Sequence, residues 1–429
     1  MKKSSSGVSL LLFVVVGCSG ELVGAGMESG RLDADVKGDR DADADVPGPS
    51  DAGGSDAVAT NPCTTSGTVP TPETSGFPNT SPTFQRVIDA DQTGGLVSPS
   101  KYYAYAYGPS ILREGTRTHV YACTPGIVGE SWDHIRYTYS DDDGATWSTP
   151  TVVLASTSYA VTGKDYSACD PSIVFQDGYY YLFYSGAENI GGPISNGSDP
   201  SETIQTVIRV ARATTPAGPF AKFTNRHTWE VGASDPLTLV ESKTFTKGRY
   251  GVGQQSVVRM GGNLYMWYLD DTAADGVFKI KLRIAPAPWE FGHEYLEFDT
   301  NNGLAGLEVR YDPRSKLFIS LGVPTYMNIA AIILSTSPDG IEWTKYPAEI
   351  VSSPDMRHHA RIEGGFTGDA AGHLLDGPTL FGFAAPHVGP GGSVPTDPEI
   401  EATLAKGPYW DLFSLRTDDL SERLFRVCP

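Results

Sequence analysis

A short pattern of residues recurs along this chain and limits its possible folds more than any other feature of the sequence. Two copies are nearly identical, Gly-Pro-Ser-Ile at 108–111 and Asp-Pro-Ser-Ile at 170–173. Three looser copies complete a set of five, which is Tyr107–Leu112, Cys169–Val174, Gly253–Val258, Leu307–Tyr311 and Ala360–Glu363. The copies follow one another at intervals of about 50 to 85 residues, which is typical of a repeated structural unit.

The repeated segments lie among stretches that are typical of short β-strands joined by tight turns. Aromatic and β-branched residues are concentrated in four runs, namely Tyr179–Tyr184, Leu264–Tyr268, Lys316–Ser320 and Leu380–Phe383. No long stretch has the period of a helix. Units of about 70 residues with about four strands each predict an all-β fold, a five-bladed β-propeller over residues 81–429. A two-sheet sandwich is the alternative, but it does not explain the repeated Pro-Ser-Ile.

Two segments resemble the Asp-box, a turn found in sialidases and related propellers. Ser140–Trp147 fits the pattern S-x-D-x-G-x-T-W, and Ser337–Trp343 is a shorter version. In such a turn the Asp side chain accepts hydrogen bonds from backbone amides and Gly takes a positive φ. We therefore expect Asp142 and Asp339 to be structural rather than catalytic.

The first residues resemble the signal peptide of a bacterial lipoprotein. Lys2 and Lys3 precede an apolar run over Val8–Val16, which is too short to span a bilayer. The run ends in Val-Val-Gly-Cys, which resembles a lipobox, so residues 1–18 are expected to be the signal and Cys18 the site of lipidation. An ordinary secretory signal with an unrelated Cys is the alternative. Acyl chains on Cys18 would anchor the exported protein to a bacterial membrane, at the outer membrane or cell surface.

Residues 19–80 have the composition of a disordered acidic linker. Large apolar side chains are almost absent after Leu32, so the segment cannot bury enough surface to offset the entropy of ordering. Its aspartates lack the Gly and distal Glu of a calcium-binding EF-hand loop. The whole chain has a formal charge of −19, which argues against binding nucleic acid through phosphates. We expect a monomer whose tether holds the propeller away from the membrane.

Four cysteines follow Cys18, and an even number in an exported protein suggests two disulfides. Three pairings are possible. We favour Cys63 with Cys428, which would close the domain end to end, and therefore Cys123 with Cys169. Free buried thiols are the alternative. No spacing of Cys and His suggests a zinc site.

The second repeat unit resembles a blade of the family 43 and family 32 glycoside hydrolases. The resemblance is carried by Asp170–Val174, Asp177–Gly186 and Ala211–Phe220. It implies a five-bladed propeller that acts on arabinans, xylans, fructans or similar glycans, with three acids in the central funnel. Asp170 matches the Asp of blade two. The equivalent positions hold Gly108 in blade one and Gln254 or Gln255 in blade three, where the family has Asp and Glu.

Glycoside hydrolysis usually needs two carboxyl groups on either side of the scissile bond, with one of them protonated. Asp170 and Glu308 are the predicted catalytic pair, because both hold the first inner-strand position of their units. The structural alternatives are an ion pair of Glu308 with Arg310 or Arg361, and a turn-capping role of Asp170 before Pro171. Asp165 and Glu188 are placed on loops that could reach the funnel.

Sugar sites also use aromatic faces and polar groups that form paired hydrogen bonds. The predicted substrate-binding residues share these properties and are Tyr105, Tyr107, Trp132, Gln254, Gln255 and Arg361. Packing within a blade is the alternative for the tyrosines. The resemblance implies no required cofactor and is compatible with a central Ca²⁺, near which His358 or His359 would lie.

The sequence thus predicts an exported, carbohydrate-active propeller that hydrolyses a poly- or oligosaccharide. A catalytically inactive propeller that binds glycans at the cell surface is the alternative, which the absent blade-one Asp and blade-three Glu favour. A purely protein-binding propeller is a third class. A sialidase is disfavoured, because the usual Arg-Ile-Pro start is absent and six blades do not fit.

Overall fold

The computed structural model describes residues 85–98, 101–127, 131–157, 164–189, 204–243, 249–272, 277–292, 296–323, 331–352, 364–386 and 409–425. The predicted signal, the linker, Cys18, Cys63, Cys428 and Arg361 lie outside these residues. The boundaries proposed for the signal and the linker therefore stay predictions. Within the described ranges, no helix is long and apolar enough to cross a membrane.

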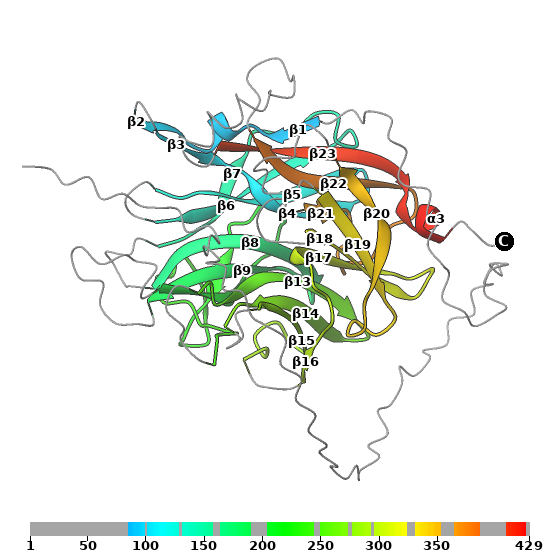
Figure 1. Cartoon of the computed structure of the whole chain (residues 1–429). Coiled ribbons are helices and arrows are strands. Elements are labelled where there is room, and N and C mark those ends of the chain that lie inside the picture. Colours follow the sequence, from blue (N-terminus) through cyan, green and yellow to red (C-terminus); the bar gives the residue numbers. More distant parts are fainter. Residues whose placement is uncertain are drawn as a thin grey trace, which may run out of the picture.

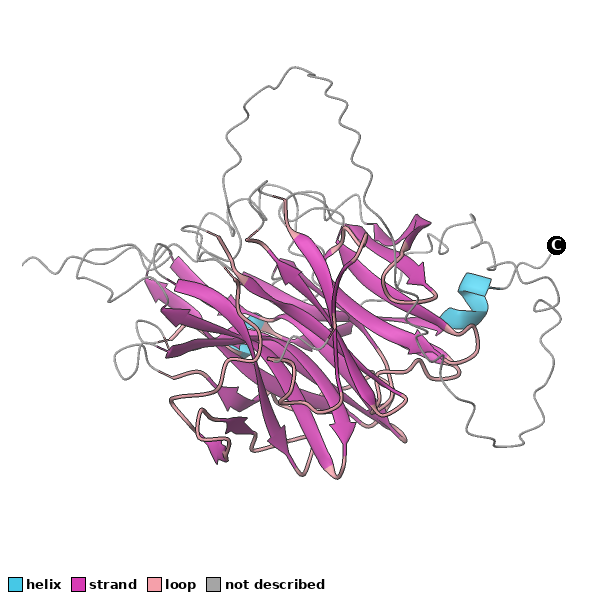
Figure 2. Cartoon of the chain, turned by 90° about the horizontal axis from the view of Figure 1, so that it is seen from below, coloured by secondary structure: helices cyan, strands magenta, loops and turns pink. Residues whose placement is uncertain are grey.

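Five β-sheets surround a central axis, which confirms the predicted all-β, five-bladed propeller (Figures 1 and 2). Blades one to four each follow one continuous part of the chain. Blade one contains β4 (Tyr107–Glu114), β5 (Arg117–Pro125), β6 (Asp133–Ser140) and β7 (Thr151–Ala155). Blade two contains β8 (Lys164–Gln176), β9 (Tyr179–Asn189), β10 (Ile204–Ala213), β11 (Ala221–Phe223) and β12 (Trp229–Val231).

Blades three and four repeat the same order of antiparallel strands. Blade three contains β13 (Val252–Met260), β14 (Asn263–Asp270), β15 (Lys279–Ala285) and β16 (Glu297–Asp299). Blade four contains β17 (Ala305–Asp312), β18 (Leu317–Val323), β19 (Ala331–Ser337) and β20 (Thr344–Ser352). The first strand of each blade is the innermost, so β4, β8, β13 and β17 face the axis.

Blade five joins the two ends of the described chain and closes the ring. It contains β21 (Gly364–Phe366), β22 (Pro378–Pro386) and β23 (Tyr409–Asp419) from the C-terminal part. The early strand β1 (Gln85–Ile88) pairs antiparallel with β23, and β3 (Lys101–Tyr105) pairs parallel with it. β2 (Gly95–Ser98) extends β3, and Figure 1 shows β1 and β23 side by side. The short helices η2 (Ala90–Gln92) and α3 (Leu420–Phe425) flank this blade.

A β-bulge interrupts each inner strand of blades one to four at the same place. In each bulge one residue adopts a left-handed backbone, and these residues are Gly108 (φ 57°), Asp170 (46°), Gln254 (52°) and Gly306 (56°). A bulge of this kind bends the strand and redirects side chains toward the axis. The repeated Pro-Ser-Ile motif is therefore the sequence of a repeated bulge.

The position of the bulge in β17 shows that the predicted alignment of blade four is wrong. The sequence motif predicts that Glu308 is equivalent to Asp170, but the left-handed residue of β17 is Gly306. Glu308 lies two residues further on and pairs with Leu321, as Ser172 pairs with Phe183 in blade two. The error arose because blade four lacks Pro and Ser after the left-handed residue, so the motif gave no register there. The predicted inner-strand segment of blade five, Ala360–Glu363, lies outside the described residues, so its alignment stays a prediction.

The two Asp-box-like segments form tight turns between the third and fourth strands of their blades. Asp142 accepts hydrogen bonds from the backbone and side chain of Thr146, and Asp339 accepts from the amides of Ile341 and Glu342. These hydrogen bonds favour the ionised form of each acid and lower the pKa of Asp142 to about 2. They also lower the pKa of Asp339, although burial acts in the opposite direction. Neither Asp lines the central cavity.

Candidate active site in the central pore

A cavity lies on the axis of the ring, where the inner strands of all five blades meet. Its volume of about 20 Å³ admits a water molecule or one hydroxyl group rather than a whole sugar ring. It is lined by Gly108, Pro109, Asp170, Pro171, Gln254, Gln255, Gly306, Leu307, Glu308 and Gly364. Asp170 and Glu308, the predicted catalytic pair, thus share one cavity.

Asp170 is the left-handed residue of the bulge in β8 and is only 9% exposed. Asp tolerates this backbone better than most residues with a side chain, but it still carries strain. Bonds from blade three hold it: Tyr250 Oη donates to Oδ2 over 2.8 Å, and Gln255 Nε2 donates to its backbone oxygen. The acid is therefore fixed at both its carboxylate and its backbone.

Glu308 lies deeper in the ring and is 5% exposed. Its carboxylate contacts the Arg310 guanidinium, and Ser110 Oγ of blade one lies 3.4 Å from Oε1. Burial raises the pKa of Glu308 to about 7, although Arg310 and Ser110 favour the charged form. Burial thus favours the neutral carboxylic acid, whereas the contact with Arg310 favours the carboxylate.

Arg310 of blade four forms hydrogen bonds to blade one and to blade five. It is 1% exposed, and it donates to the carbonyl oxygens of Val309, Ile111 and Phe366, each over 3.2 Å. The ion pair between Glu308 and Arg310 was the structural alternative foreseen for Glu308, and it is present. The same carboxyl therefore both lines the cavity and belongs to a buried ion pair.

In each of the first three blades, a serine occupies the position that corresponds to Glu308. Ser110, Ser172 and Ser256 each lie two residues after a left-handed residue. Each accepts a hydrogen bond from a backbone amide of the next inner strand, over 3.3, 2.9 and 2.8 Å respectively. These serines connect neighbouring blades. In blade four the longer Glu308 instead reaches Ser110, beyond the short strand β21.

The two glutamines predicted to bind substrate contact protein groups in this structure. Gln254 Oε1 accepts from Gly306 N over 3.0 Å, and Gln255 Oε1 accepts from Ser185 Oγ over 3.2 Å. Both residues line the cavity, at 5% and 3% exposure. A bound glycan would have to share these hydrogen bonds or replace them.

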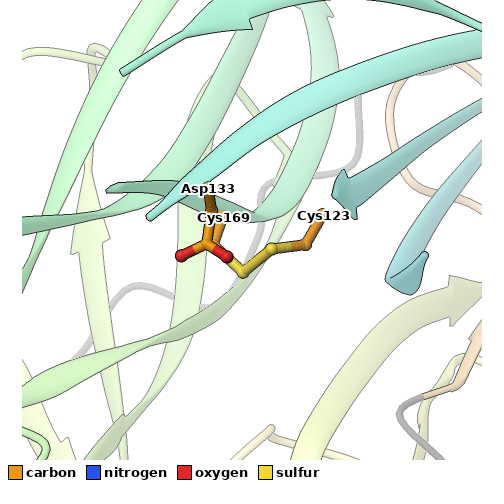
Figure 3. Close-up of side chains that lie close together, drawn as sticks. All are labelled: Cys123, Asp133 and Cys169. Carbon is orange, nitrogen blue, oxygen red and sulfur yellow. A yellow bond between two sulfur atoms is a disulfide. The ribbon is translucent and has the colours of Figure 1, made fainter. Parts of the chain in front are cut away.

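A disulfide joins Cys123 to Cys169, which confirms that part of the predicted pairing (Figure 3). It connects β5 of blade one to β8 of blade two, immediately before Asp170. Tyr107 Oη lies 3.0 Å from Cys169 Sγ. Tyr107 is buried and is not among the residues that line the cavity, so its predicted role in binding sugar stays a prediction.

Tyr105 is 2% exposed, and its hydroxyl donates to Asp133 Oδ1 over 2.5 Å. It packs beside Tyr107 and Trp410, with ring centroids 5.5 and 6.1 Å away. This burial argues against a sugar stacking on Tyr105 and favours the packing alternative. Trp132 is half-buried against Tyr166 and does not line the cavity.

Asp165 and Glu188 do not reach the pore. Asp165 is fully buried in a cluster with Arg209 and Lys222, and Glu188 contacts the same arginine over 2.9 Å. Both acids therefore belong to a network of charged side chains within blade two. Their charges are matched within the blade, so they are not candidates for catalysis.

No protein-family model matches this chain, and no curated protein matches it. Among solved structures, a family 117 glycoside hydrolase of the marine bacterium Zobellia galactanivorans is similar at 14% identity and a TM-score of 0.49, over 81% of this chain and 92% of that one. An α-L-arabinofuranosidase of Lactobacillus brevis matches at 12% identity and 0.48, over 78% and 97%. The catalytic domain of a family 62 α-L-arabinofuranosidase of Coprinopsis cinerea matches at 13% and 0.46, over 79% and 98%.

One group of potential metal ligands occurs among the described residues, Cys123, Asp133 and Cys169 (Figure 3). The two sulfurs are bonded to each other, so they are not thiolate ligands in this state. Calcium prefers six to eight oxygen ligands. Asp170 and Glu308 do not form a group of three acidic or histidine ligands with other described residues, so a central Ca²⁺ stays a prediction.

Tyr250 and Ser185 are parts of the site that the sequence did not indicate. Tyr250 precedes β13 by two residues and contacts Asp170, whereas Ser185 lies in β9 and contacts Gln255. Neither belongs to the repeated motif. The only local signal was Gly253, which stands where the preceding blades have Tyr107 and Cys169.

Proposed function

We propose that this protein is a glycoside hydrolase whose active site is the mouth of the central pore. The observation that carries the proposal is that Asp170 and Glu308 line the same cavity, while burial raises the pKa of Glu308 to about 7. Two carboxyl groups in different environments are what an acid and a carboxylate partner require.

Glu308 would donate its proton to the glycosidic oxygen as the bond to the anomeric carbon breaks. Asp170, as a carboxylate, would stabilise the positive charge that develops on the sugar and accept a proton from the water whose hydroxyl replaces the leaving group. One water is consumed, and each product gains a hydroxyl. The substrate would be a poly- or oligosaccharide lying across the pore, with one group inserted into the small cavity.

The test is sugar release from arabinan, xylan and fructan by the full chain. We expect Asp170→Asn and Glu308→Gln each to lower kcat/KM by about 10²- to 10⁴-fold, the usual contribution of an acid or base. Asp177→Asn is the matched control, because Asp177 is exposed in the turn at the other end of β8 and its left-handed φ of 50° suits Asn. Equal activity of all four proteins would place the chemistry elsewhere.

A glycan-binding protein without catalysis is the second candidate. It is favoured by Gln254 and Gln255, which line the cavity where the resemblance implies an acid, and by the pairing of Glu308 with Arg310. No sugar release, together with retention of one polysaccharide in a pull-down that Asp170→Asn weakens, would support it.

We also propose that the protein is exported and lipid-anchored through Cys18 as a monomer. The support is the basic start, the apolar run and the lipobox-like end of residues 1–18. Cys18→Ser should abolish labelling by a palmitate analogue in cells and release the protein from the membrane fraction. Labelling that survives this substitution would exclude Cys18.

A further inference from the structure

The phenol of Tyr250 lies against the carboxylate of Asp170, and the two residues belong to different blades. Tyr250 Oη donates to Asp170 Oδ2 over 2.8 Å. We propose that Tyr250 is a positioning residue, which orients the carboxylate of Asp170 toward a glycan at the pore. This inference rests on the function proposed above and names a further residue of the same site.

Space for this phenol is provided by Gly253. A Cβ at this position would lie 2.5 Å from Tyr250 Oη and 2.6 Å from Ser185 Oγ, so any larger residue would displace one of them. The equivalent residues of the other bulges carry side chains, namely Tyr107, Cys169 and Ala305. Blade three therefore lacks a side chain where the hydroxyl of Tyr250 must fit.

The backbone of Tyr250 is also fixed. Its carbonyl oxygen accepts from the amide and hydroxyl of Thr206 over 2.8 and 2.6 Å, and its amide donates to Asp271 Oδ2 over 3.2 Å. The next residue, Gly251, has a φ of 99° and lies close to Thr206. A Cβ added to Gly251 would lie 2.6 Å from the backbone oxygen of Thr206. Because both the amide and the carbonyl oxygen of Tyr250 are hydrogen-bonded, its backbone can hold the phenol in one position.

The neighbouring hydrogen bonds and their distances indicate which group accepts the proton of the Tyr250 hydroxyl. Ser185 accepts from the amide of Gln254 over 3.0 Å and has one proton, which it donates to Gln255 Oε1 over 3.2 Å. Gln255 Nε2 in turn donates to the backbone oxygen of Asp170. Tyr250 Oη also lies 3.4 Å from Ser185 Oγ, but Asp170 Oδ2 is closer at 2.8 Å, so the phenol proton is directed to Asp170. A carboxylate held in this way suits the role of the charged partner, while Glu308 supplies the proton.

The test compares Tyr250→Phe with the wild type in sugar release from arabinan, xylan and fructan and in crystal structures. We expect kcat to fall about 10- to 100-fold with KM changed by less than about twofold, since a misplaced catalytic group costs rate rather than binding. The structure of the variant should show the Asp170 carboxylate rotated away from its wild-type orientation. The loss in kcat should disappear in an Asp170→Asn background.

Tyr180→Phe is the matched control, because Tyr180 also donates to a carboxylate of the neighbouring blade, Glu114 Oε1, over 2.7 Å and lies away from the cavity. It should leave kcat unchanged. Gly253→Ala, which displaces the phenol without removing it, should reproduce the loss if Tyr250→Phe does not fold. An unmoved Asp170 carboxylate, or an unchanged kcat, would overturn the inference. A wild type that releases no sugar would instead refute the proposed function, and the orientation of Asp170 in the variant would still decide the inference.

Discussion

Glu308 in blade four occupies the position that Ser256 occupies in blade three, two residues after the left-handed residue of the inner-strand bulge. Serines at this position bond to the next inner strand. Glu308 instead extends to Ser110 and Arg310 and brings a second carboxyl group to the cavity of Asp170. One change of side chain within a repeated framework thus creates the pair on which the proposed function depends.

We expect sugar release to decline as the pH rises through about 7. Burial raises the pKa of Glu308 to about 7, and only the protonated form can donate to the leaving oxygen. The measurement is kcat/KM for the best polysaccharide between pH 5 and 9, at about half-unit steps. A rate that stays constant from pH 6 to 9 would show that Glu308 is not the acid.

We expect Glu308 to make the fold less stable as the pH increases. Its pKa is raised from 4.5 to about 7 on folding, so between these values the folded protein retains a proton that the unfolded chain has lost. Stability is highest below the lower value and falls by about 3 kcal/mol up to the higher one.

Urea unfolding of the wild type and of Glu308→Gln from pH 4.5 to 7.5 tests this, because the Gln variant should lack that decline. His119 titrates in the opposite sense, since burial and the nearby Arg117 lower its pKa to about 4. His119 is present in both proteins, so its effect cancels in the difference between the curves. Two parallel curves would contradict the prediction.

We expect Arg310→Met to destabilise the fold by about 3–5 kcal/mol, the usual loss when one partner of a buried ion pair is removed. Three backbone carbonyl oxygens would also lose a donor. The measurement is the free energy of unfolding in guanidinium chloride at pH 7. Arg226→Met is the control: the Arg226 side chain is 75% exposed in its pair with Glu230, so no measurable change is expected. Similar losses in both variants would refute the prediction.

We expect the double variant Cys123→Ala and Cys169→Ala to lose about 2–4 kcal/mol of stability. The disulfide closes a loop between residues 46 apart in sequence and thereby restricts the unfolded chain. Unfolding of the oxidised wild type and of the double variant gives the difference. Dithiothreitol should lower the stability of the wild type and leave the double variant unchanged. An equal response of both would assign the effect to other cysteines.

Much of the architecture followed from the sequence, for a local physical reason. Gly-Pro-Ser-Ile and Asp-Pro-Ser-Ile describe a bulge, and alternating strand and turn residues describe a blade, so the repeat determined both the fold and the place of Asp170 on an inner strand. The four cysteines after Cys18 allow three pairing schemes, and only one of them joins Cys123 to Cys169. The approach of β5 to β8 in the folded protein brings these two cysteines together.

The tertiary structure alone decided what surrounds these residues. The register of Glu308 depended on a bulge at Gly306 that no motif marks. The burial of Tyr105, and the contact of Tyr250 with Asp170 across 80 positions of sequence, depended on how neighbouring blades pack. Sequence patterns report the conformation of each strand, whereas an active site at the centre of a ring is made by side chains from separate strands. Their distances are therefore determined only when the ring closes.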